Sequence, residues 1–255
     1  MDLGIAGRTA IICASSKGLG RACAMEIARA GCAVVVNGRD AARLEATADD
    51  IRAATGARVT AVPGDVSDAS VREALLAACP APDILVNNNG GPPPAAFETL
   101  TREQILRGIE ANMLTPIALI QRVAPGMAER AFGRIVNITS ASVRAPIAGL
   151  DVSSGARAGL TAFLASAARK YTRHNVTINS IQPGAFDTDR IKETLANSPL
   201  GETAAREARA KAIPAGRLGS PEEFGALCAF LASAHAGYIA GQNILIDGGV
   251  FPGAF

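Results

Sequence analysis

The sequence has little excess charge of either sign and no long apolar run, and these two shortages exclude several classes of protein. Its 255 residues carry 25 Lys and Arg against 23 Asp and Glu, without a basic run that would hold a nucleic-acid backbone. No apolar stretch reaches the ~18 residues that a membrane-spanning helix needs. The N-terminal segment lacks the basic residues, apolar run and cleavage site of a signal peptide. We therefore expect a cytoplasmic protein whose partners include neither nucleic acid nor membrane.

The cysteines show neither a CxxC pair nor any other spacing typical of metal ligands. They are Cys13, Cys23, Cys32, Cys79 and Cys228. An odd number of cysteines in a chain without an export signal indicates reduced thiols. The simplest interpretation is that all of them are small core residues, so the sequence predicts no metal site.

Short runs rich in β-branched residues alternate with longer alanine-rich stretches along the chain. The short runs are apolar on both faces, as in parallel strands covered by helices on two sides. They predict strands at Thr9–Cys13, Ala33–Asn37, Arg58–Val62, Ile84–Asn87, Arg134–Thr139, Thr177–Ile181 and Asn243–Ile246. The longer stretches predict helices at Leu19–Ala30, Ala41–Thr55, Ala69–Ala78, Arg102–Glu129, Ser153–Tyr171, Ile191–Lys211 and Pro221–Ala232. Pro116 and Pro125 should bend or break the longest of these helices.

The alternation of strand and helix predicts the fold class. Two helix starts carry capping signals, since Ser220 precedes Pro221 and Thr101 precedes an acidic first turn. A hydrophobic content of 49 % suits one large core. No linker, repeat or low-complexity tract interrupts the pattern. We therefore predict an α/β protein with a doubly wound, Rossmann-type parallel sheet, helices on both faces, and a single domain over residues 1–255.

A glycine-rich turn joins the first predicted strand to the first predicted helix. It reads Ala14-Ser15-Ser16-Lys17-Gly18-Leu19-Gly20. Such a turn lets backbone N–H groups approach a pyrophosphate, and the helix N-terminus adds a favourable partial positive charge. The alternative is an ordinary tight turn that needs glycine for its backbone angles. Its place at the start of the first βαβ unit favours a dinucleotide site.

The end of the second predicted strand bears on the choice between NADH and NADPH. An NAD-specific site usually has an acid there, which binds the ribose 2′-hydroxyl. This chain has Gly38 and then Arg39, whose planar guanidinium suits a 2′-phosphate unless it is simply solvated. Lys17 in the glycine turn is placed to reach the same phosphate. Asp40 is better explained as the cap of the next helix, so the sequence favours NADP(H).

Further motifs follow the glycine turn in order. They are Asp65-Val66, Asn87-Asn88-Asn89-Gly90, Asn112, Asn137-Ile138-Thr139-Ser140, Pro183-Gly184 with Thr188, and Asp247-Gly248-Gly249. Together with the turn, in which Cys13 and Ala14 stand where Thr and Gly are usual, these segments resemble the short-chain dehydrogenases/reductases. Within that family they are most similar to the 3-oxoacyl-acyl-carrier-protein reductases. The resemblance spans nearly the whole chain.

The resemblance carries several implications for fold and function. It implies the strand order 3-2-1-4-5-6-7 and the NADPH-dependent reduction of a 3-oxoacyl or related carbonyl compound to an alcohol. It also implies a homodimer or homotetramer that pairs through Arg102–Glu129 and Ser153–Tyr171. The implied catalytic residues are Asn112, Ser140, Ser153 and Arg157. The implied cofactor-binding residues are Ala14, Ser16, Lys17, Gly18, Leu19, Gly20, Arg39, Asp65, Val66, Asn88, Gly90, Arg157, Pro183, Gly184 and Thr188.

Two of the implied catalytic residues depart from the family's pattern. Counting from Ser140, the positions where the family carries Tyr-x-x-x-Lys hold Ser153 and Arg157. No displaced copy exists, because Tyr171 and Tyr238 are the only tyrosines and neither is followed by a lysine four residues later.

These two differences change the chemistry that the site offers. A serine hydroxyl is far less acidic than a phenol, which titrates near ~10. Arg157 hydrogen-bonds a ribose but stays protonated, and Ser140 still stabilises a developing oxyanion. Three functions stay open. The first is a reductase whose proton comes from Ser140, from a water held by Ser153, or from the substrate. The second is an NADP(H)-binding sensor or structural subunit without turnover. The third is a non-redox elimination or isomerisation.

The substrate pocket is expected between the segments Gly90–Pro94, Ala141–Asp151 and Phe186–Pro214, the last of which is a candidate lid. Two arginines bear on the substrate: Arg144 and Arg190 either face this pocket and favour an anionic substrate, such as an acyl thioester or a carboxylate, or are simply solvated. Asp151 and Asp187 lie near active-site positions and are candidates for a replacement acid, although loop carboxylates are more often solvated.

Overall fold

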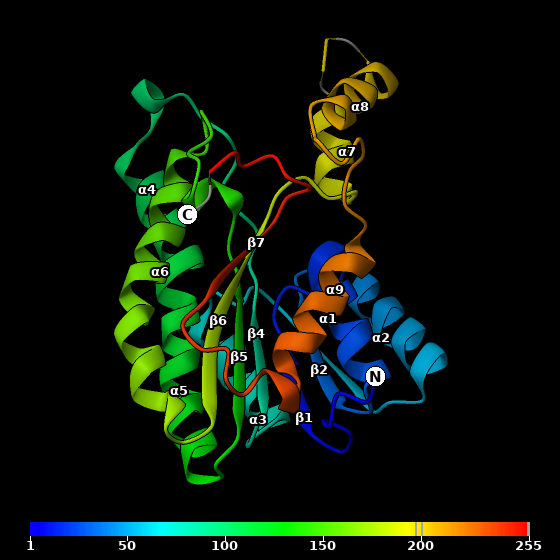
Figure 1. Ribbon diagram of the computed structural model, residues 1–255, viewed down its shortest axis with the longest axis vertical. Coiled ribbons are helices and arrows are strands. Elements are labelled where there is room, and N and C mark those ends of the chain that lie inside the picture. Colours follow the sequence, from blue (N-terminus) through cyan, green and yellow to red (C-terminus); the bar gives the residue numbers. More distant parts are fainter. Residues whose placement is uncertain (197, 200, 254–255) are drawn as a thin grey trace.

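The computed structural model describes residues 1–196, 198–199 and 201–253. In this part of the chain the sheet has seven parallel strands in the order β3-β2-β1-β4-β5-β6-β7 (Figure 1). The strands are β1 Thr9–Ile12, β2 Ala33–Gly38, β3 Val59–Pro63, β4 Ile84–Asn87, β5 Gly133–Ile138, β6 Val176–Pro183 and β7 Asn243–Ile246. The predicted fold class and strand order are confirmed, and the bounds of the strands differ from the prediction by at most two residues.

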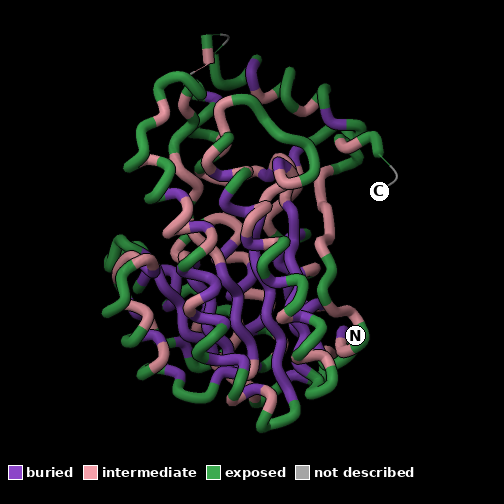
Figure 2. The backbone as a smooth tube through the Cα atoms, turned by 90° about the vertical axis from the view of Figure 1, so that its left-hand side faces the viewer, coloured by how far each residue is buried: buried purple, intermediate pink, exposed green. Residues whose placement is uncertain are grey.

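Helices cover both faces of this sheet. They are α1 Gly18–Arg29, α2 Ala41–Thr55, α3 Ala69–Ala78, α4 Arg102–Ile109, α5 Thr115–Glu129, α6 Asp151–Thr172, α7 Asp189–Ala196, α8 Glu202–Lys211 and α9 Pro221–Ala232. One apolar core lies between the sheet and α1, α2 and α9, and a second lies between the sheet and α3, α5 and α6. Successive residues of β1 serve the two cores in turn, since Ala10 and Ile12 join the first and Ile11 the second. Figure 2 shows the buried strands running through the middle of the molecule.

The helix starts follow the capping chemistry of the sequence. Ser220 and Thr101 each accept a hydrogen bond from the backbone N–H three residues on, and both form complete capping boxes. The Asp40 carboxylate accepts from the backbone N–H of Arg43, so Asp40 caps α2 as predicted. All five cysteines are buried free thiols, as expected for core residues. None of the helices in the described ranges has the length and apolarity to cross a membrane.

One predicted helix is wrong in part. The segment Ile191–Lys211 was expected to be continuous, but it forms α7 and α8 with a break between them. Pro199 lacks the N–H that a continuing helix needs, and Gly201 has a left-handed φ of 75°. The predicted helix also included residues 197 and 200, which lie outside the described residues.

The longest predicted helix, Arg102–Glu129, is interrupted just before its first proline, Pro116. The backbone forms a π turn at Glu110–Leu114 between α4 and α5, and Pro116 lies in the first turn of α5. That break agrees with the prediction for Pro116. A proline in the first turn of a helix is favourable because the N–H that it lacks would have no partner within the helix. Pro125 does not break the chain, since α5 continues to Glu129. The buried apolar face of α5 outweighs the single hydrogen bond that Pro125 removes.

The strand ends set the place of the site. The glycine turn follows β1, Asn88 follows β4, Ser140 follows β5 and Gly184 follows β6. The carboxyl ends of parallel strands meet at one edge of a sheet, where ligands of doubly wound folds bind. Above this edge α4 rises on one side and α7 with α8 on the other (Figure 1).

Candidate active site

Three elements supply the four residues predicted to be catalytic. Asn112 lies in the π turn, Ser140 follows β5, and Ser153 and Arg157 lie one turn apart on α6. Arg157 connects two of the others, because it donates a hydrogen bond to Ser153 and lines one cavity together with Asn112. Ser140 lies two residues beyond Ile138, whose carbonyl accepts from Arg157.

The Arg157 guanidinium is buried without a carboxylate partner among the described residues. Arg157 as a whole residue is only 7 % exposed. Nη1 donates to the Ile138 carbonyl at 2.6 Å, Nη2 to the Asn89 carbonyl at 3.2 Å, and Nε to Ser153 Oγ at 3.2 Å. Burial, and then the nearby charge of Arg190, lower the pKa of Arg157 to about 10. The group therefore stays charged at neutral pH and projects a positive potential into the site.

The Ser153 hydroxyl is positioned by this contact. Arg157 Nε donates to its oxygen, so the hydroxyl proton is directed to a different acceptor. Ser140 is held in another way, since Ser142 donates both its backbone N–H, at 3.1 Å, and its hydroxyl, at 2.9 Å, to Ser140 Oγ. Each serine thus accepts a fixed donor and keeps its own O–H for a ligand.

A small polar cavity lies beside Arg157. It has a volume of about 10 Å³ and is lined by Asn87, Asn88, Asn89, Ala111, Asn112, Pro116, Asn137, Ile138, Arg157 and Leu160. A cavity needs roughly 10–15 Å³ to hold one water, so this cavity has room for about one. The Oδ1 atoms of Asn87 and Asn112 are buried and receive no hydrogen bond within the described part of the chain. Such orphaned acceptors indicate a place where polar contacts beyond this chain are made.

The glycine turn forms an open cradle at the start of α1. Lys17 is the N-cap residue and its side chain makes no capping hydrogen bond. Gly18 has a left-handed φ of 57°. A Cβ added at Gly20 would lie 2.4 Å from the Ala14 carbonyl oxygen, so α1 starts against the turn only because residue 20 is glycine. The N–H groups of the first turn of α1 are therefore left for a ligand rather than for a side chain.

The end of β2 has no room for an acidic side chain. A Cβ added at Gly38 would lie 2.7 Å from Ser16 Oγ. The following Arg39 is exposed. Lys17 Nζ lies 3.8 Å from Asp189 Oδ2 and 3.4 Å from Glu193 Oε1, and Arg43 Nη1 lies 3.5 Å from the same Asp189 oxygen. An acidic pair at the start of α7 thus holds the cations beside this end of the sheet.

The remaining predicted cofactor residues lie in α1, at the end of β6 and in the loops after β3, β4 and β6, and two of them contact the turn. Asn88 Nδ2 donates to the Ala14 carbonyl at 3.0 Å. Thr188 Cγ2 lies 3.6 Å from where a Cβ of Gly18 would be. Leu19 is half-buried in α1, Val66 is buried, Gly90 is exposed, Pro183 ends β6, and Gly184 packs so closely on Asp247 that a Cβ would lie 2.7 Å from its side chain. The carboxylate of Asp65 accepts a hydrogen bond from the backbone N–H of Ser67, so it bonds its own loop.

Comparison with known proteins agrees with this fold. A family model described as enoyl-(acyl carrier protein) reductase matches residues 13–251. The chain belongs to the short-chain dehydrogenase/reductase family. The NADPH-dependent reductase BacG of Bacillus subtilis is 33 % identical over 251 residues, covering 95 % of this chain and 97 % of that protein. The 3-oxoacyl-[acyl-carrier-protein] reductase FabG of Pseudomonas aeruginosa is 31 % identical over 252 residues, covering 98 % and 99 %. The L-sorbose reductase of Gluconobacter frateurii, solved with NADPH and L-sorbose, superposes with a TM-score of 0.91 at 28 % identity, covering 98 % of each chain.

In this member of the short-chain dehydrogenase/reductase family, Asp187 is not a replacement acid. Both of its carboxylate oxygens bond Arg206, at 2.9 and 2.5 Å. The contact with Arg206 lowers the pKa of Asp187, so the carboxyl is ionised at neutral pH and has no proton to give. Asp151 is exposed at the start of α6.

The two arginines of the substrate segments have different roles. Arg144 turns to the last strand, where Nε donates to Gln182 Oε1 at 3.2 Å and Nη2 to the Asn243 carbonyl at 3.3 Å. Arg190 instead reaches from α7 to the loop after β4, where Nη1 donates to the Gly91 carbonyl at 3.4 Å.

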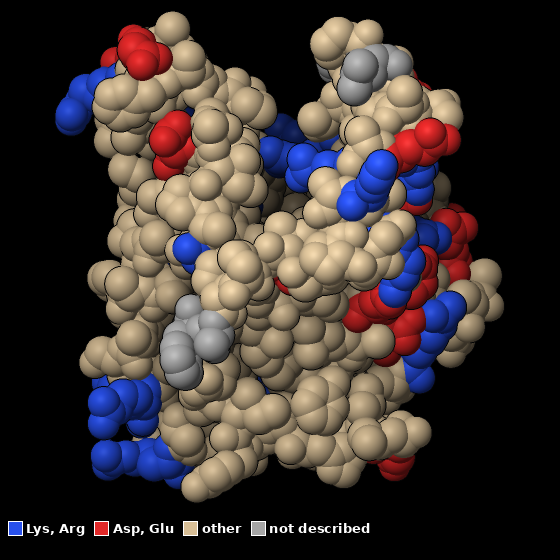
Figure 3. Space-filling view, turned by 45° about the horizontal axis from the view of Figure 1, so that its top comes forward, with Lys and Arg blue, Asp and Glu red and all other residues tan. Residues whose placement is uncertain are grey.

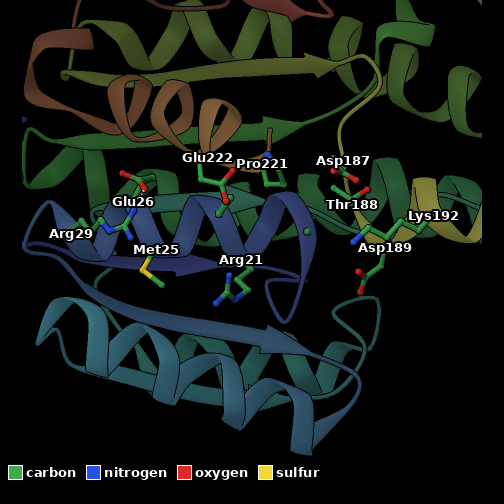
Figure 4. A pocket seen from close by; sticks show the side chains of 12 residues that line it. Arg21, Met25, Glu26, Arg29, Asp187, Thr188, Asp189, Lys192, Pro221 and Glu222 are labelled. Atoms are coloured by element: carbon green, nitrogen blue, oxygen red, sulfur yellow. Dashed lines mark hydrogen bonds and ion pairs between the residues drawn. The ribbon is translucent and has the colours of Figure 1, made fainter. Parts of the chain in front are cut away.

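A larger groove of about 280 Å³ lies between α1, the start of α9 and the segment that leads into α7 (Figure 4). At one end it includes Gly18 and Thr188 of the cradle. None of the four residues predicted to be catalytic lines it. Three cations line it: Arg21 and Arg29 are paired with Asp50 and Glu26, and Lys192 comes from α7. The groove therefore borders the cofactor cradle, whereas the smaller cavity is lined by Asn112 and Arg157, two of the residues predicted to be catalytic.

Three residues of the site were missed by sequence reasoning. Ser142 carried a usable signal, because a second hydroxyl two residues after Ser140 can bond the first within one short turn. Arg43 and Asp189 carried none, since only the folded chain brings α2 and α7 together.

Proposed function

We propose that the protein is an NADPH-dependent oxidoreductase that reduces a carbonyl group, of a 3-oxoacyl compound or a related ketone, to an alcohol, with Ser153 and Arg157 in place of the family's Tyr and Lys. The observation that carries this proposal is the buried Arg157, which has no carboxylate partner among the described residues, lines a polar cavity and donates to Ser153. Such a charge stabilises negative charge that develops on a carbonyl oxygen. The names of BacG and FabG support a reductase of this type.

The residues of the cradle suit a dinucleotide with a 2′-phosphate. The uncapped N-terminus of α1 would bind the pyrophosphate, while Lys17 and Arg39 would bind the 2′-phosphate. The crowding of Gly38 by Ser16 excludes the acid that an NAD-specific site uses. Arg157, Asn88, Gly90 and the Pro183-Gly184 segment would hold the nicotinamide half. NADPH bound there supplies the hydride.

The side chains divide the remaining work. The hydroxyls of Ser140 and Ser153 donate hydrogen bonds to the carbonyl oxygen as it gains negative charge, and Arg157 keeps Ser153 in position for this. Neither serine is acidic enough to be an efficient general acid at neutral pH. The proton therefore comes from water at the cavity that Asn112 lines. Losing a dedicated general acid costs roughly 10²–10⁴ in rate, so turnover is expected to be slow.

Oxidation of NADPH in the presence of 3-oxoacyl thioesters, diketones and quinones tests the proposal. We expect measurable turnover that falls about 10-fold or more in Ser140→Ala and in Ser153→Ala, because each removes a hydrogen-bond donor to the oxyanion. Thr161→Ala, one turn beyond Arg157 on α6, is the control and should keep the wild-type rate. Tight NADPH binding without oxidation of any substrate would favour the sensor or structural subunit. Conversion of substrate with unchanged NADPH absorbance would favour elimination or isomerisation.

We also propose that the chain is one domain and that it pairs with copies of itself through the face formed by α4, α5 and α6. Large apolar side chains are exposed there: Leu106 is 48 %, Leu114 45 % and Phe163 54 % exposed. Light scattering should give the mass of a dimer or tetramer, and Phe163→Asp should lower it. A monomeric wild-type mass at micromolar concentration would contradict this proposal.

The acidic start of α7 should limit the affinity for NADPH. Asp189 pairs with Lys17 and Arg43, and Lys17 must leave it to meet a 2′-phosphate. We expect Asp189→Asn to tighten NADPH binding about two- to fivefold, as exposed ion pairs are worth ~0.2–1 kcal/mol each, and to leave NADH binding unchanged. Titration calorimetry with both cofactors measures the effect. Glu222→Gln in the neighbouring groove is the control, and equal tightening of NADH would show that Asp189 acts elsewhere.

A further inference from the structure

Two guanidinium groups converge on one short stretch of backbone at the mouth of the site. Arg157 comes from α6 and donates to the Asn89 carbonyl at 3.2 Å. Arg190 comes from α7 and donates to the Gly91 carbonyl at 3.4 Å. Their acceptors are two residues apart in the loop after β4, so two positive charges approach this loop, one from α6 and one from α7. Figure 3 shows Lys and Arg atoms along the wall of the hollow between the two raised lobes.

No carboxylate in the described part of the chain lies within ion-pair distance of either guanidinium. The acids nearest to Arg190 in the sequence are engaged elsewhere, since Asp187 bonds Arg206 and Asp189 pairs with Lys17 and Arg43. The two arginines also repel each other, because the charge of Arg190 contributes to lowering the pKa of Arg157. A buried charge beside a second like charge is costly unless an anion joins them.

Gly91 is the residue that gives Arg190 this position. A Cβ added at Gly91 would lie 3.1 Å from Arg190 Nη1 and 3.2 Å from Nη2. The Nη1–Nη2 edge of the guanidinium therefore faces the bare backbone of the loop at Gly91. Its one protein contact there uses a single N–H, and a guanidinium has five in a planar fork that matches two carboxylate oxygens.

We propose that the site takes substrates that carry a carboxylate close to the carbonyl group that is reduced, and that Arg190 is the residue that selects for it. The inference rests on the proposed function and names its substrate class. The anion lies between Arg190 and Arg157, which places the neighbouring carbonyl oxygen at Ser153 and Ser140. In the reaction the carbonyl carbon gains the hydride of NADPH, the oxygen takes the electron pair of the π bond and a proton from water, and the carboxylate is unchanged. The products are a hydroxy acid and NADP⁺.

The same anionic oxygens have a second source, the pyrophosphate of the cofactor. The test separates the two with a matched pair of substrates, acetoacetate and its neutral methyl ester, together with the Kd for NADPH. Arg190→Gln should lower kcat/KM for acetoacetate by roughly 10-fold or more, the scale of a charge-assisted hydrogen bond of ~1.5–3 kcal/mol. The value for methyl acetoacetate and the Kd for NADPH should change by less than about twofold.

Two further variants make the result specific. Gly91→Ala keeps both arginines but crowds the guanidinium of Arg190, so it should lower the preference for acetoacetate in the same direction. Lys192→Gln removes a positive charge from the same helix on the side of the outer groove, and it should leave the preference unchanged. An equal loss for both substrates in Arg190→Gln, or a weaker NADPH complex with an unchanged preference, would overturn the proposal in favour of the pyrophosphate.

Failure of the proposed function itself gives a different result. If wild type oxidises NADPH with neither compound, binding of acetoacetate and of the ester is measured by calorimetry on the NADP⁺ complex. Binding of acetoacetate alone, lost in Arg190→Gln, would keep the carboxylate site while the reductase is abandoned. Absence of acetoacetate binding would overturn the carboxylate site as well.

Discussion

Arg157→Met should lower kcat/KM for NADPH-dependent reduction by about 10²–10⁴ while leaving the protein folded. The substitution removes the positive charge from the cavity and the N–H that holds Ser153. Methionine fills much of the same volume, so the packing of α6 against β6 is retained. The loss should therefore be in the chemical step rather than in folding.

The stability of this variant is set by two opposing effects. The Ile138 and Asn89 carbonyls lose their donor, which costs about 1–3 kcal/mol each if they stay dry. The variant also no longer buries a charge without a carboxylate partner, and that relief is of similar size. We expect the midpoint of thermal unfolding to move by only a few degrees.

Two comparisons make the Arg157 experiment decisive. Arg144→Met makes the same change in an exposed arginine that bonds β6 and β7, and it should keep most of the activity. Arg157→Lys keeps the charge but not the fork, so it should fall between Met and wild type. Wild-type activity in Arg157→Met would remove the observation on which the proposed function depends.

Arg134→Met should be the most destabilising single substitution far from the site. Arg134 is 1 % exposed at the start of β5. Its guanidinium donates to the carbonyls of Ser233, Gly133 and Asn175 and to Asn175 Oδ1. It also lies 4.4 Å from the centre of the Phe132 ring. One side chain thus joins the loop before β6, the start of β5 and the end of α9.

The expected loss is about 3 kcal/mol, because several buried acceptors lose their donor at once. For a chain of this size that corresponds to roughly 6–10 °C in the unfolding midpoint. The relief of a buried charge, whose pKa burial lowers to about 10, offsets only part of this loss. Calorimetry measures it, with Arg8→Met as the milder comparison, since Arg8 makes one partly exposed ion pair with Asp83. A shift below about 2 °C would show that water replaces the guanidinium at little cost.

Most of the fold was predictable from the sequence because local pattern and global packing agree. The strands Ile84–Asn87 and Asn243–Ile246 and the helices α2, α3 and α9 have the predicted bounds. Apolar runs bounded by caps and glycines leave little choice at these places. A predicted helix failed where a single residue decides, as at Gly201. The break expected at Pro125 is absent, because packing of α5 outweighs the lost hydrogen bond, and the helix ends at Glu129 as predicted.

The candidate site was predictable in its backbone and less so in its side-chain partners. Motif positions located Ser140, Ser153 and Arg157, but spacing along the chain says nothing of what a guanidinium bonds. Asp189 of α7 forms ion pairs with Lys17, at the start of α1, and with Arg43 of α2. These elements are distant in sequence, and only tertiary structure brings them within ion-pair distance. The orphaned oxygen of Asn112 is likewise a property of the packed cavity.

At the π turn Glu110–Leu114, the number of residues in the helix determines how α4 is rotated relative to α5. Each residue added to or removed from a helix rotates everything beyond it by about 100°. A π turn accommodates one residue more than regular α-helical spacing, so the faces of α4 and α5 differ in phase across it. Deleting one residue here would restore a regular helix and rotate the exposed face of α4 relative to that of α5, with Asn112 at the pivot. The orientation of the surface that α4 presents beside the cleft is therefore stored in a single extra residue.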